Sequence, residues 1–103
     1  MIDLLNKHLL IIQDILRTHV PDCEVRAFGS RTNGTSHAGS DLDLVLVSKE
    51  PLGWKLMAKL KNAFSESNLP FEVDVLDWNV IPENFKENIE KQYEVVEAAA
   101  KIH

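Results

Sequence analysis

The sequence has little cysteine, no excess of basic residues and no long hydrophobic run. Its one cysteine, Cys23, cannot form an intramolecular disulfide, so the reducing cytoplasm is the expected compartment. The formal net charge of -5 argues against direct binding to nucleic acid, because domains that bind it usually carry a basic patch. No apolar run approaches the roughly 20 residues that a membrane-spanning helix needs, and the segment after Met1 is amphipathic, unlike a signal peptide. We therefore expect neither a membrane nor a nucleic-acid partner.

The composition is that of one small folded domain covering residues 1–103. Hydrophobic residues make up 45% of the 103 residues and charged residues 26%, which is ordinary for a globular protein. No internal repeat, low-complexity tract or linker-like stretch divides the chain. The sequence therefore predicts a single domain with a modest core.

Hydrophobic spacing predicts that helices and strands alternate along the chain. An apolar stripe with steps of three and four residues indicates a first helix, and Pro21 favours its end near His19. Three strands are expected at residues 24–28, 41–48 and 71–78. The second of them is nearly continuously apolar, which is typical of a central strand buried on both faces. A polar loop containing one helical turn is expected over residues 31–40.

Two further helices are expected after the second and third strands. Pro51 and Pro82 should begin them, since proline is favoured in the first helical turn. Their apolar stripes are predicted to be Trp54, Met57, Leu60 and Phe64 in one, and Phe85, Ile89, Tyr93 and Val96 in the other. The order predicts a small α/β domain with helices packed on a sheet of three or slightly more strands. Strand order stays open, although the helix between the second and third strands permits a parallel crossover.

Three aspartates fall on two of these strands. Asp41 and Asp43 lie two residues apart and so share a face, about 6.6 Å apart along the strand. If the third strand pairs with the second near these residues, Asp74 lies roughly 5 Å from one of them. Three like charges so close would not stay ionised without a countercharge. Oxygen ligands favour Mg²⁺ or Mn²⁺ over zinc, and two such ions form the clamp used for displacement at phosphorus. The alternative for an isolated aspartate is a solvated turn residue, which we expect of Asp77.

A second motif lies where the first strand ends. Gly29 lets the backbone approach a ligand closely, and exposed N–H groups there can bind phosphate oxygens. Ser30 adds a hydroxyl donor and Arg31 a planar cation suited to phosphate. The stretch is neither a P-loop nor a dinucleotide-binding fingerprint, because the glycine spacing differs and no Gly-Lys-Ser/Thr follows. On its own, a Gly-Ser pair is more often an ordinary turn.

Taken together, GSRTNG, SDLDL and EVDVL resemble the DNA polymerase β-like nucleotidyltransferase superfamily. More narrowly, the chain is similar to the minimal nucleotidyltransferases (MNT proteins), which have about this length. The resemblance covers nearly the whole chain. It implies a DNA polymerase β-like nucleotidyltransferase core, a small mixed β-sheet flanked by helices.

The resemblance also implies roles for the acids. Asp41 and Asp43 would bind two Mg²⁺ ions, with Mn²⁺ as an alternative metal. Asp74 would ligate one of these ions and help to deprotonate the attacking hydroxyl. Charge that develops at the α-phosphate as pyrophosphate leaves would be stabilised there.

For the nucleotide, the resemblance implies that Gly29 and Ser30 hold the triphosphate of ATP. Arg31 and Ser40 belong to the expected nucleotide-binding set. Asn33 is a departure, because many relatives have a basic residue there, and phosphate affinity is expected to be lower for it.

The resemblance further implies a protein partner. Minimal nucleotidyltransferases typically pair with HEPN proteins, which are small helical RNases, and act as antitoxins that transfer AMP to a tyrosine of the toxin. The expected function is therefore that of an adenylyltransferase antitoxin. Two alternatives stay open: a binding module that neutralises its partner sterically, and a free-standing enzyme that modifies a small molecule.

Overall fold

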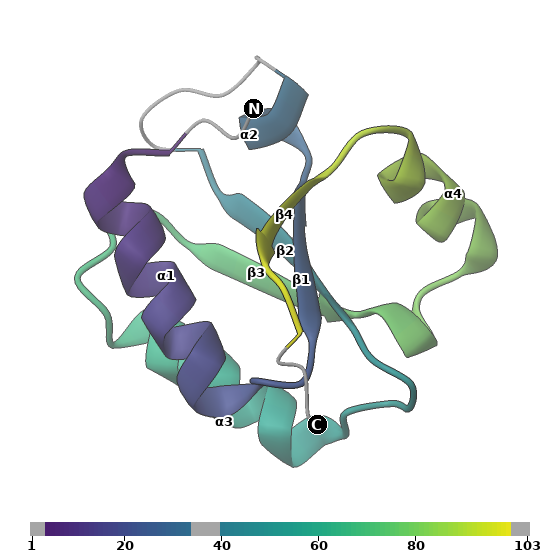
Figure 1. Ribbon diagram of the computed structural model, residues 1–103, viewed down its shortest axis with the longest axis horizontal. Coiled ribbons are helices and arrows are strands. Elements are labelled where there is room, and N and C mark those ends of the chain that lie inside the picture. Colours follow the sequence, from purple (N-terminus) through teal and green to yellow (C-terminus); the bar gives the residue numbers. More distant parts are fainter. Residues whose placement is uncertain (1–3, 34–39, 100–103) are drawn as a thin grey trace.

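The computed structural model describes residues 4–33 and 40–99, which form a four-stranded sheet with helices on both faces (Figure 1). The elements are α1 (Asn6–His19), β1 (Glu24–Phe28), α2 (Ser30–Asn33), β2 (Leu42–Val47), α3 (Trp54–Ser65), β3 (Val73–Asp77), the 3-10 turn η1 (Trp78–Val80), α4 (Glu83–Lys91) and β4 (Glu94–Glu97). In the part of the chain that is described, no helix is long and apolar enough to cross a membrane.

The sheet has the strand order β3-β2-β1-β4. β2 and β3 are parallel, whereas β1 pairs antiparallel with both β2 and β4, so the sheet is mixed as expected. The central position predicted for β2 is confirmed, and Leu44, Val45 and Leu46 are fully buried in it. The parallel crossover through α3 brings the start of β3 to the same end of the sheet as the start of β2.

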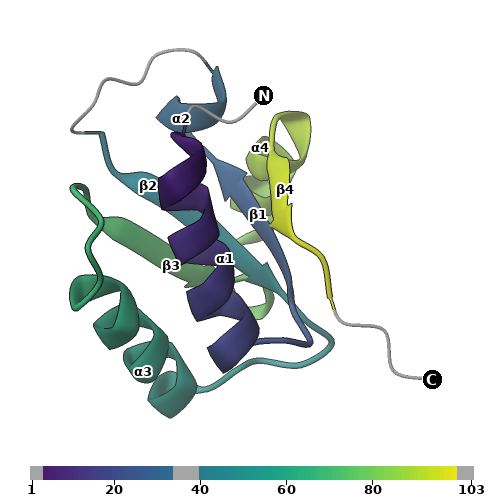
Figure 2. The ribbon, with the colours of Figure 1, turned by 60° about the vertical axis from the view of Figure 1, so that its left-hand side comes forward.

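The helices lie on opposite faces of the sheet. α1 and α3 pack side by side over one face, and α4 lies over the other (Figures 1 and 2). The apolar stripes of the first two helices provide the core, with Ile12 and Leu16 of α1 and Leu60 of α3 fully buried. One face of the sheet is therefore filled by the core, and functional groups are confined to the other face and to the strand ends.

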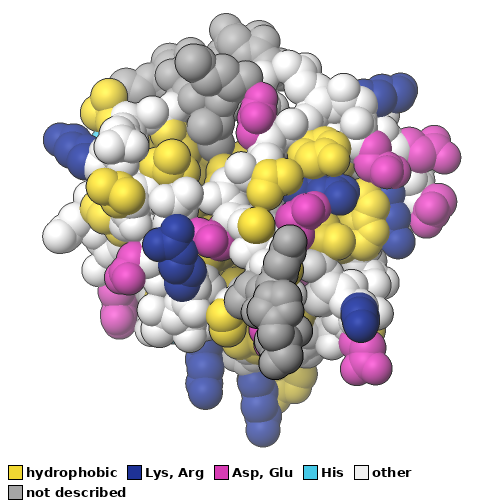
Figure 3. All heavy atoms as spheres, viewed as in Figure 1, with side chains coloured by type: hydrophobic (Ala, Val, Ile, Leu, Met, Phe, Trp, Pro, Cys, Tyr) yellow, Lys and Arg dark blue, Asp and Glu magenta, His cyan; other side chains and the backbone are white. Residues whose placement is uncertain are grey.

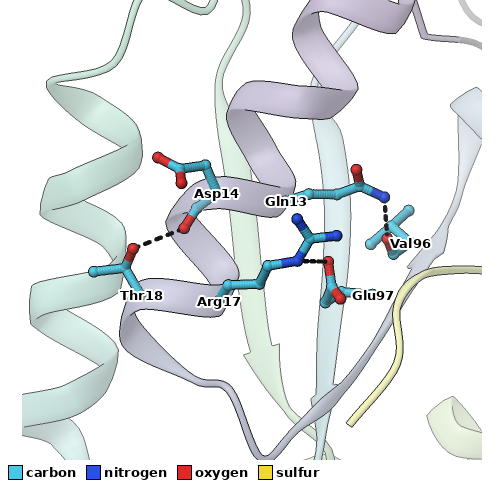
Figure 4. A network of polar contacts seen from close by, with 6 residues as sticks. All are labelled: Gln13, Asp14, Arg17, Thr18, Val96 and Glu97. Carbon is cyan, nitrogen blue, oxygen red and sulfur yellow. Dashed lines mark hydrogen bonds and ion pairs between the residues drawn. The ribbon is translucent and has the colours of Figure 1, made fainter. Parts of the chain in front are cut away.

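α1 is fastened to the edge strand β4 by polar contacts (Figure 4). The Gln13 side chain donates a hydrogen bond from Nε2 to the carbonyl oxygen of Val96 at 2.9 Å. One turn later, Arg17 Nε lies 3.1 Å from Glu97 Oε2. The helix ends at His19, as Pro21 predicted.

The prediction that the last helix continues through Val96 is wrong. α4 ends at Lys91, and Gln92 adopts an extended conformation with φ -157° and ψ 110°. The following residues form β4, which pairs antiparallel with β1. The physical reason is that the exposed edge of β1 offers a full set of backbone partners, and the pair Val95 and Val96 is β-branched and suits a strand.

The predicted start of α3 at Pro51 is also wrong. The backbone N–H of Leu52 donates to Asp77 Oδ2 at 2.7 Å, which holds this segment outside the helix. Gly53 then has φ 87° and turns the chain into α3 at Trp54. Trp54 is 76% exposed and therefore lies off the apolar stripe to which it was assigned.

Candidate active site at one end of the sheet

The two strands that carry the acids pair with each other, and their register brings two of the three acids together. Asp43 of β2 lies directly opposite Asp74 of β3. Asp43 is partly buried and Asp74 is exposed, and both belong to the face of the sheet that α1 and α3 leave uncovered. Opposed residues of neighbouring strands have Cβ atoms about 5 Å apart, so the two carboxylates share one small volume.

Asp41 is the third acid at this end. It lies just before β2 and is exposed to solvent. Burial raises the pKa of Asp43 above its ordinary value, and the negative charges of Asp74 and then Asp41 raise it further. All three carboxylates therefore act on one another electrostatically, which makes this end of the sheet a place for cations.

The three carboxylates do not converge on one point in the observed conformation. Within residues 4–33 and 40–99, no group of three or more Asp, Glu, His or Cys side chains is arranged to hold a metal ion. Asp41 and Asp74 are exposed, however, so their side chains have room to change rotamer. The oxygen-only donor set and the mutual repulsion of the acids fit a hard divalent cation.

Gly29 faces the acids from the end of β1. The antiparallel pairing of β1 with β2 places Phe28 opposite Asp43, and the chain then turns at Gly29 with φ 80°. A Cβ atom at Gly29 would lie 2.5 Å from Asp43 Oδ2. Glycine is thus required by the backbone conformation and by the carboxylate beside it.

The chain continues into the single helical turn α2. Thr32 fixes this turn to the strand end, with its N–H donating to the Gly29 carbonyl at 3.0 Å and its Oγ1 donating to the same oxygen at 2.9 Å. Ser30 begins the turn directly after Gly29 and is partly exposed. The predicted helical turn is confirmed, while the rest of the predicted loop, residues 34–39, lies outside the described residues.

Arg31 joins the two ends of this loop. Its guanidinium donates to the Ser40 carbonyl oxygen from Nε at 3.0 Å and from the terminal nitrogen Nη2 at 2.8 Å. The guanidinium carbon lies 4.2 Å from the centre of the Phe71 ring, and Arg31 is only 6% exposed. The observed contacts therefore position the loop, and a contact between Arg31 and phosphate stays a prediction.

Asp77 is not the solvated turn residue that we expected. It is 5% exposed and accepts hydrogen bonds from the backbone N–H groups of Leu52 and Asn79, at 2.7 and 3.0 Å. It also lies on the core side of β3, because Asp74 and Asp77 are three residues apart on a strand. Asp77 therefore stabilises the turn at the far end of the site rather than contributing to it.

The sequence pattern did not reveal an aromatic and cationic cluster on the open face of the sheet. Arg26 of β1 pairs with Glu24, and its guanidinium carbon lies 5.1 Å from the Trp78 ring and 4.5 Å from the Tyr93 ring. On the face between β4 and α4, Figure 3 shows hydrophobic side chains gathered around a basic and an acidic group. The polar-apolar alternation of residues 24–28 was the one available signal, because it places Arg26 and Phe28 on the same face.

Comparison with known proteins places this geometry in a family. The family model described as "Polymerase beta, Nucleotidyltransferase" matches residues 11–100. The chain belongs to this family. The polymerase beta nucleotidyltransferase core expected from the sequence is thereby confirmed, together with the mixed sheet and flanking helices that carry it.

The chain is also similar to a named bacterial protein over nearly its whole length. It is 46% identical over 100 residues to the probable protein adenylyltransferase MntA of Haemophilus influenzae, a match that covers 97% of this chain and 88% of the relative. The expected similarity to minimal nucleotidyltransferases is therefore confirmed, and the chain is an enzyme of the nucleotidyltransferase class by family.

Solved structures share the fold. A toxin–antitoxin complex with AMP-PNP contains a chain that matches with a TM-score of 0.73 at 23% identity, covering 94% of this chain and 76% of that one. A complex of a tri-AMPylated HEPN toxin with an MNT antitoxin from Shewanella oneidensis matches with a TM-score of 0.62 at 20% identity, covering 91% and 71%. At these identities the likeness establishes the fold.

Proposed function

We propose that this chain is the antitoxin of a toxin–antitoxin pair and that it transfers AMP from ATP to a tyrosine hydroxyl of a HEPN-type RNase toxin. The observation that carries the proposal is the pairing of Asp43 with Asp74 beside Gly29. This arrangement unites an anion-binding turn and a cluster of acids at one end of the sheet. The resemblance to a probable protein adenylyltransferase and to toxin–antitoxin complexes supports AMP as the group and a HEPN toxin as the partner.

Asp41, Asp43 and Asp74 would hold two Mg²⁺ ions, or Mn²⁺ in their place. When bound, the metal neutralises charge on the triphosphate and stabilises charge that develops at the α-phosphate. The pKa of Asp43 is raised first by burial and then by the charges of Asp74 and Asp41, so a cation beside it would offset both effects. Asp43 is partly buried and would be the more fixed ligand, whereas Asp41 and Asp74 are exposed and would have room to adjust.

The triphosphate would lie against the turn after β1. The backbone N–H groups at Gly29 and Ser30, with the Ser30 hydroxyl, are the donors for its oxygens, and Ser40 lies at the other end of the loop. Arg31 keeps the two loop ends together through the Ser40 carbonyl.

In the reaction, the tyrosine oxygen forms a bond to the α-phosphorus and the bond from that phosphorus to the β-phosphate oxygen breaks. Asp74 is exposed and lies opposite Asp43, and it is the group that would accept the tyrosine proton. Pyrophosphate leaves with the electron pair. Positioning by the strand ends supplies most of the catalysis, because the reacting groups are held in one geometry.

Transfer of label from ATP to the cognate toxin tests the proposal. The chain is incubated with the toxin, Mg²⁺ and ATP labelled at the α-phosphorus, and we expect label on the toxin and a mass increase of one AMP per modified tyrosine. Asp43→Asn should abolish the transfer. Asp14→Asn is the matched control, because Asp14 is an exposed aspartate on α1 remote from the acids.

Absence of label with the wild-type chain would contradict the transferase proposal. The same variants separate it from steric neutralisation. If Asp43→Asn still binds the toxin and inhibits its RNase activity at an equimolar ratio, neutralisation is by binding. If inhibition requires ATP and is lost with Asp43→Asn, it proceeds by modification. Release of pyrophosphate without any toxin, in the presence of a small-molecule acceptor, would favour the free-standing enzyme.

A further inference from the structure

A cavity of about 280 Å³ opens beside the proposed phosphate turn, between the end of β1, α2 and α4. Its lining residues are Phe28, Gly29, Thr32, Phe85, Asn88, Ile89 and Gln92. We propose that this cavity binds the adenine base of ATP and that Asn88 and Gln92 select adenine over other bases. The inference rests on the proposed function for its ligand, and it adds the place where the base binds and the residues that select it.

The cavity is unsuited to phosphate. None of its lining residues is basic. One side is formed by the C-terminal end of α4, where Ile89 lies in the last turn and Gln92 is the C-cap. The helix carries partial negative charge there on its terminal carbonyl groups. A triphosphate would be repelled there, whereas a neutral group that donates hydrogen bonds would be attracted. The phosphates therefore belong on the Gly29 side and the uncharged part of the nucleotide inside.

The walls suit a flat aromatic ring. The rings of Phe28 and Phe85 meet edge to face, with centroids 5.9 Å apart and planes at 90°, so they form two perpendicular walls. Ile89 is 2% exposed and contributes a rigid apolar surface, while Phe85 is 39% exposed and borders the mouth. Stacking of a base on such side chains is a common source of nucleotide affinity.

Two side-chain amides supply selectivity. Gln92 donates from Nε2 to the Thr32 carbonyl oxygen at 2.7 Å, which fixes the orientation of its amide and leaves Oε1 as an acceptor. Asn88 lies on α4 four residues before Gln92, which follows the end of the helix, and both residues line the cavity. An amide of Asn or Gln pairs with the N6 amino group and N7 of adenine in a bidentate manner. Guanine presents a carbonyl oxygen in place of N6, which the fixed acceptor on Gln92 would repel.

The cavity also connects with the acids. Phe28 and Phe85 line a second hollow of about 520 Å³ that contains Asp43 and Asp74. The two hollows therefore share one aromatic border, with Gly29 beside it. A single nucleotide can place its base in the first hollow and its α-phosphate beside the acids of the second.

Asn88→Ala tests the assignment, with Asn84→Ala as its matched control. Both residues are exposed on α4, so neither substitution should unfold the protein, and only Asn88 lines the cavity. Binding of ATP, purine riboside triphosphate (which lacks the N6 amino group) and tripolyphosphate to the full chain with Mg²⁺ is measured by calorimetry. We expect the wild type to bind ATP about tenfold more tightly than purine riboside triphosphate, a typical gain for one bidentate pair.

In Asn88→Ala this preference should disappear, while tripolyphosphate binding stays unchanged and Asn84→Ala behaves as wild type. In the transfer assay the KM for ATP should rise about tenfold with kcat preserved. Equal binding of ATP and purine riboside triphosphate by the wild type, or an equal loss of all three ligands in Asn88→Ala, would overturn the base site. Neither outcome depends on the toxin, so failure of the base site is distinguishable from failure of AMP transfer.

Discussion

Asp43 Oδ2 lies 2.5 Å from the point where a side chain on Gly29 would begin. The carboxylate therefore occupies the space that glycine leaves open, and the proposed phosphate turn and metal site touch at this pair. A substitution of either residue should therefore affect both the proposed phosphate turn and the proposed metal site. The other glycine with positive φ, Gly53, has no atom within 4 Å of its missing Cβ and provides a direct comparison.

Gly29→Ala should lower stability and abolish AMP transfer, whereas Gly53→Ala should lower stability alone. Both positions have φ near 80–90°, which costs a residue with a side chain about 1–3 kcal/mol. Only at Gly29 must the new methyl group displace Asp43. Urea unfolding gives the stability of each variant, and the transfer assay gives its activity. Equal activity of the two variants would show that the Gly29–Asp43 contact is not needed for transfer.

Asp43→Asn should make the metal-free protein more stable at neutral pH. The pKa of Asp43 is raised in the folded state by burial and by Asp74 and Asp41, so the folded protein binds this proton more tightly than the unfolded chain does. The stabilisation from protonation is complete below the unfolded pKa and is lost as the pH rises through the folded pKa.

The advantage of the Asn variant should therefore shrink as the pH falls from neutral through the raised pKa toward about 4. Thermal unfolding in EDTA across this range measures it, with Asp14→Asn as the control for loss of an exposed charge. A constant difference between wild type and Asp43→Asn at all pH values would contradict the proposed coupling of the acids.

ATP with Mg²⁺ should raise the melting temperature of the wild type, and Asp74→Asn should greatly reduce this shift. A ligand that binds only the folded state at a hundredfold excess over its Kd stabilises by about 2.7 kcal/mol. Asp74 is exposed, so its replacement removes a proposed ligand without disturbing the core. An undiminished shift in Asp74→Asn would remove this residue from the binding site. A shift that is equally large with ATP in EDTA would argue against a metal-dependent site.

Asp77→Asn should destabilise the fold and leave the chemistry intact. The amide places an NH₂ group against one of the N–H donors of Leu52 and Asn79, which costs about 1–3 kcal/mol for a buried unsatisfied donor. Transfer per folded molecule should match wild type at a temperature where both are folded. Asp22→Asn is the control, because Asp22 is exposed. Loss of transfer in fully folded Asp77→Asn would show that the η1 turn contributes to the site.

The sequence was sufficient to predict that β2 is a central strand, and it left the direction and register of its partner open. The near-continuous apolar run of residues 42–47 indicates burial on both faces, and the helix that follows permits a parallel crossover to β3. The placement of Asp43 opposite Asp74 depends on the register of that pairing, which no local pattern gives. The contact between Gly29 and Asp43 was only partly foreseeable, because it depends on the antiparallel direction of β1.

β4 was not predicted from the sequence, because the apolar residues of this strand also continue the helical spacing of the preceding helix. Ile89, Tyr93 and Val96 have helical spacing, yet only Ile89 lies on a helix. The strand is four residues long, too short for alternation to outweigh the helical pattern. Its stability comes from pairing with β1 and from contacts with α1, which are remote in sequence.

The contacts of Arg31 show a second limit of prediction from the sequence. A basic residue in a Gly-Ser loop suggests phosphate, and nothing local indicates that Phe71 will lie 4.2 Å beneath its guanidinium. The cavity under α4 was unpredictable for the same reason. It depends on where α4 lies over the sheet, and no motif in the sequence of α4 indicates it. Residues that act through tertiary packing are the ones that local patterns do not reveal.

β4 also affects how the domain can be assembled during synthesis. It closes the edge of β1, yet it follows all the other described elements along the chain. A nascent chain on the ribosome can bring the acids and the glycine turn together while β1 still exposes a row of unpaired backbone groups. Such an edge is a template for strands of other chains. The residues that complete the sheet therefore remove this template only once the whole domain has emerged.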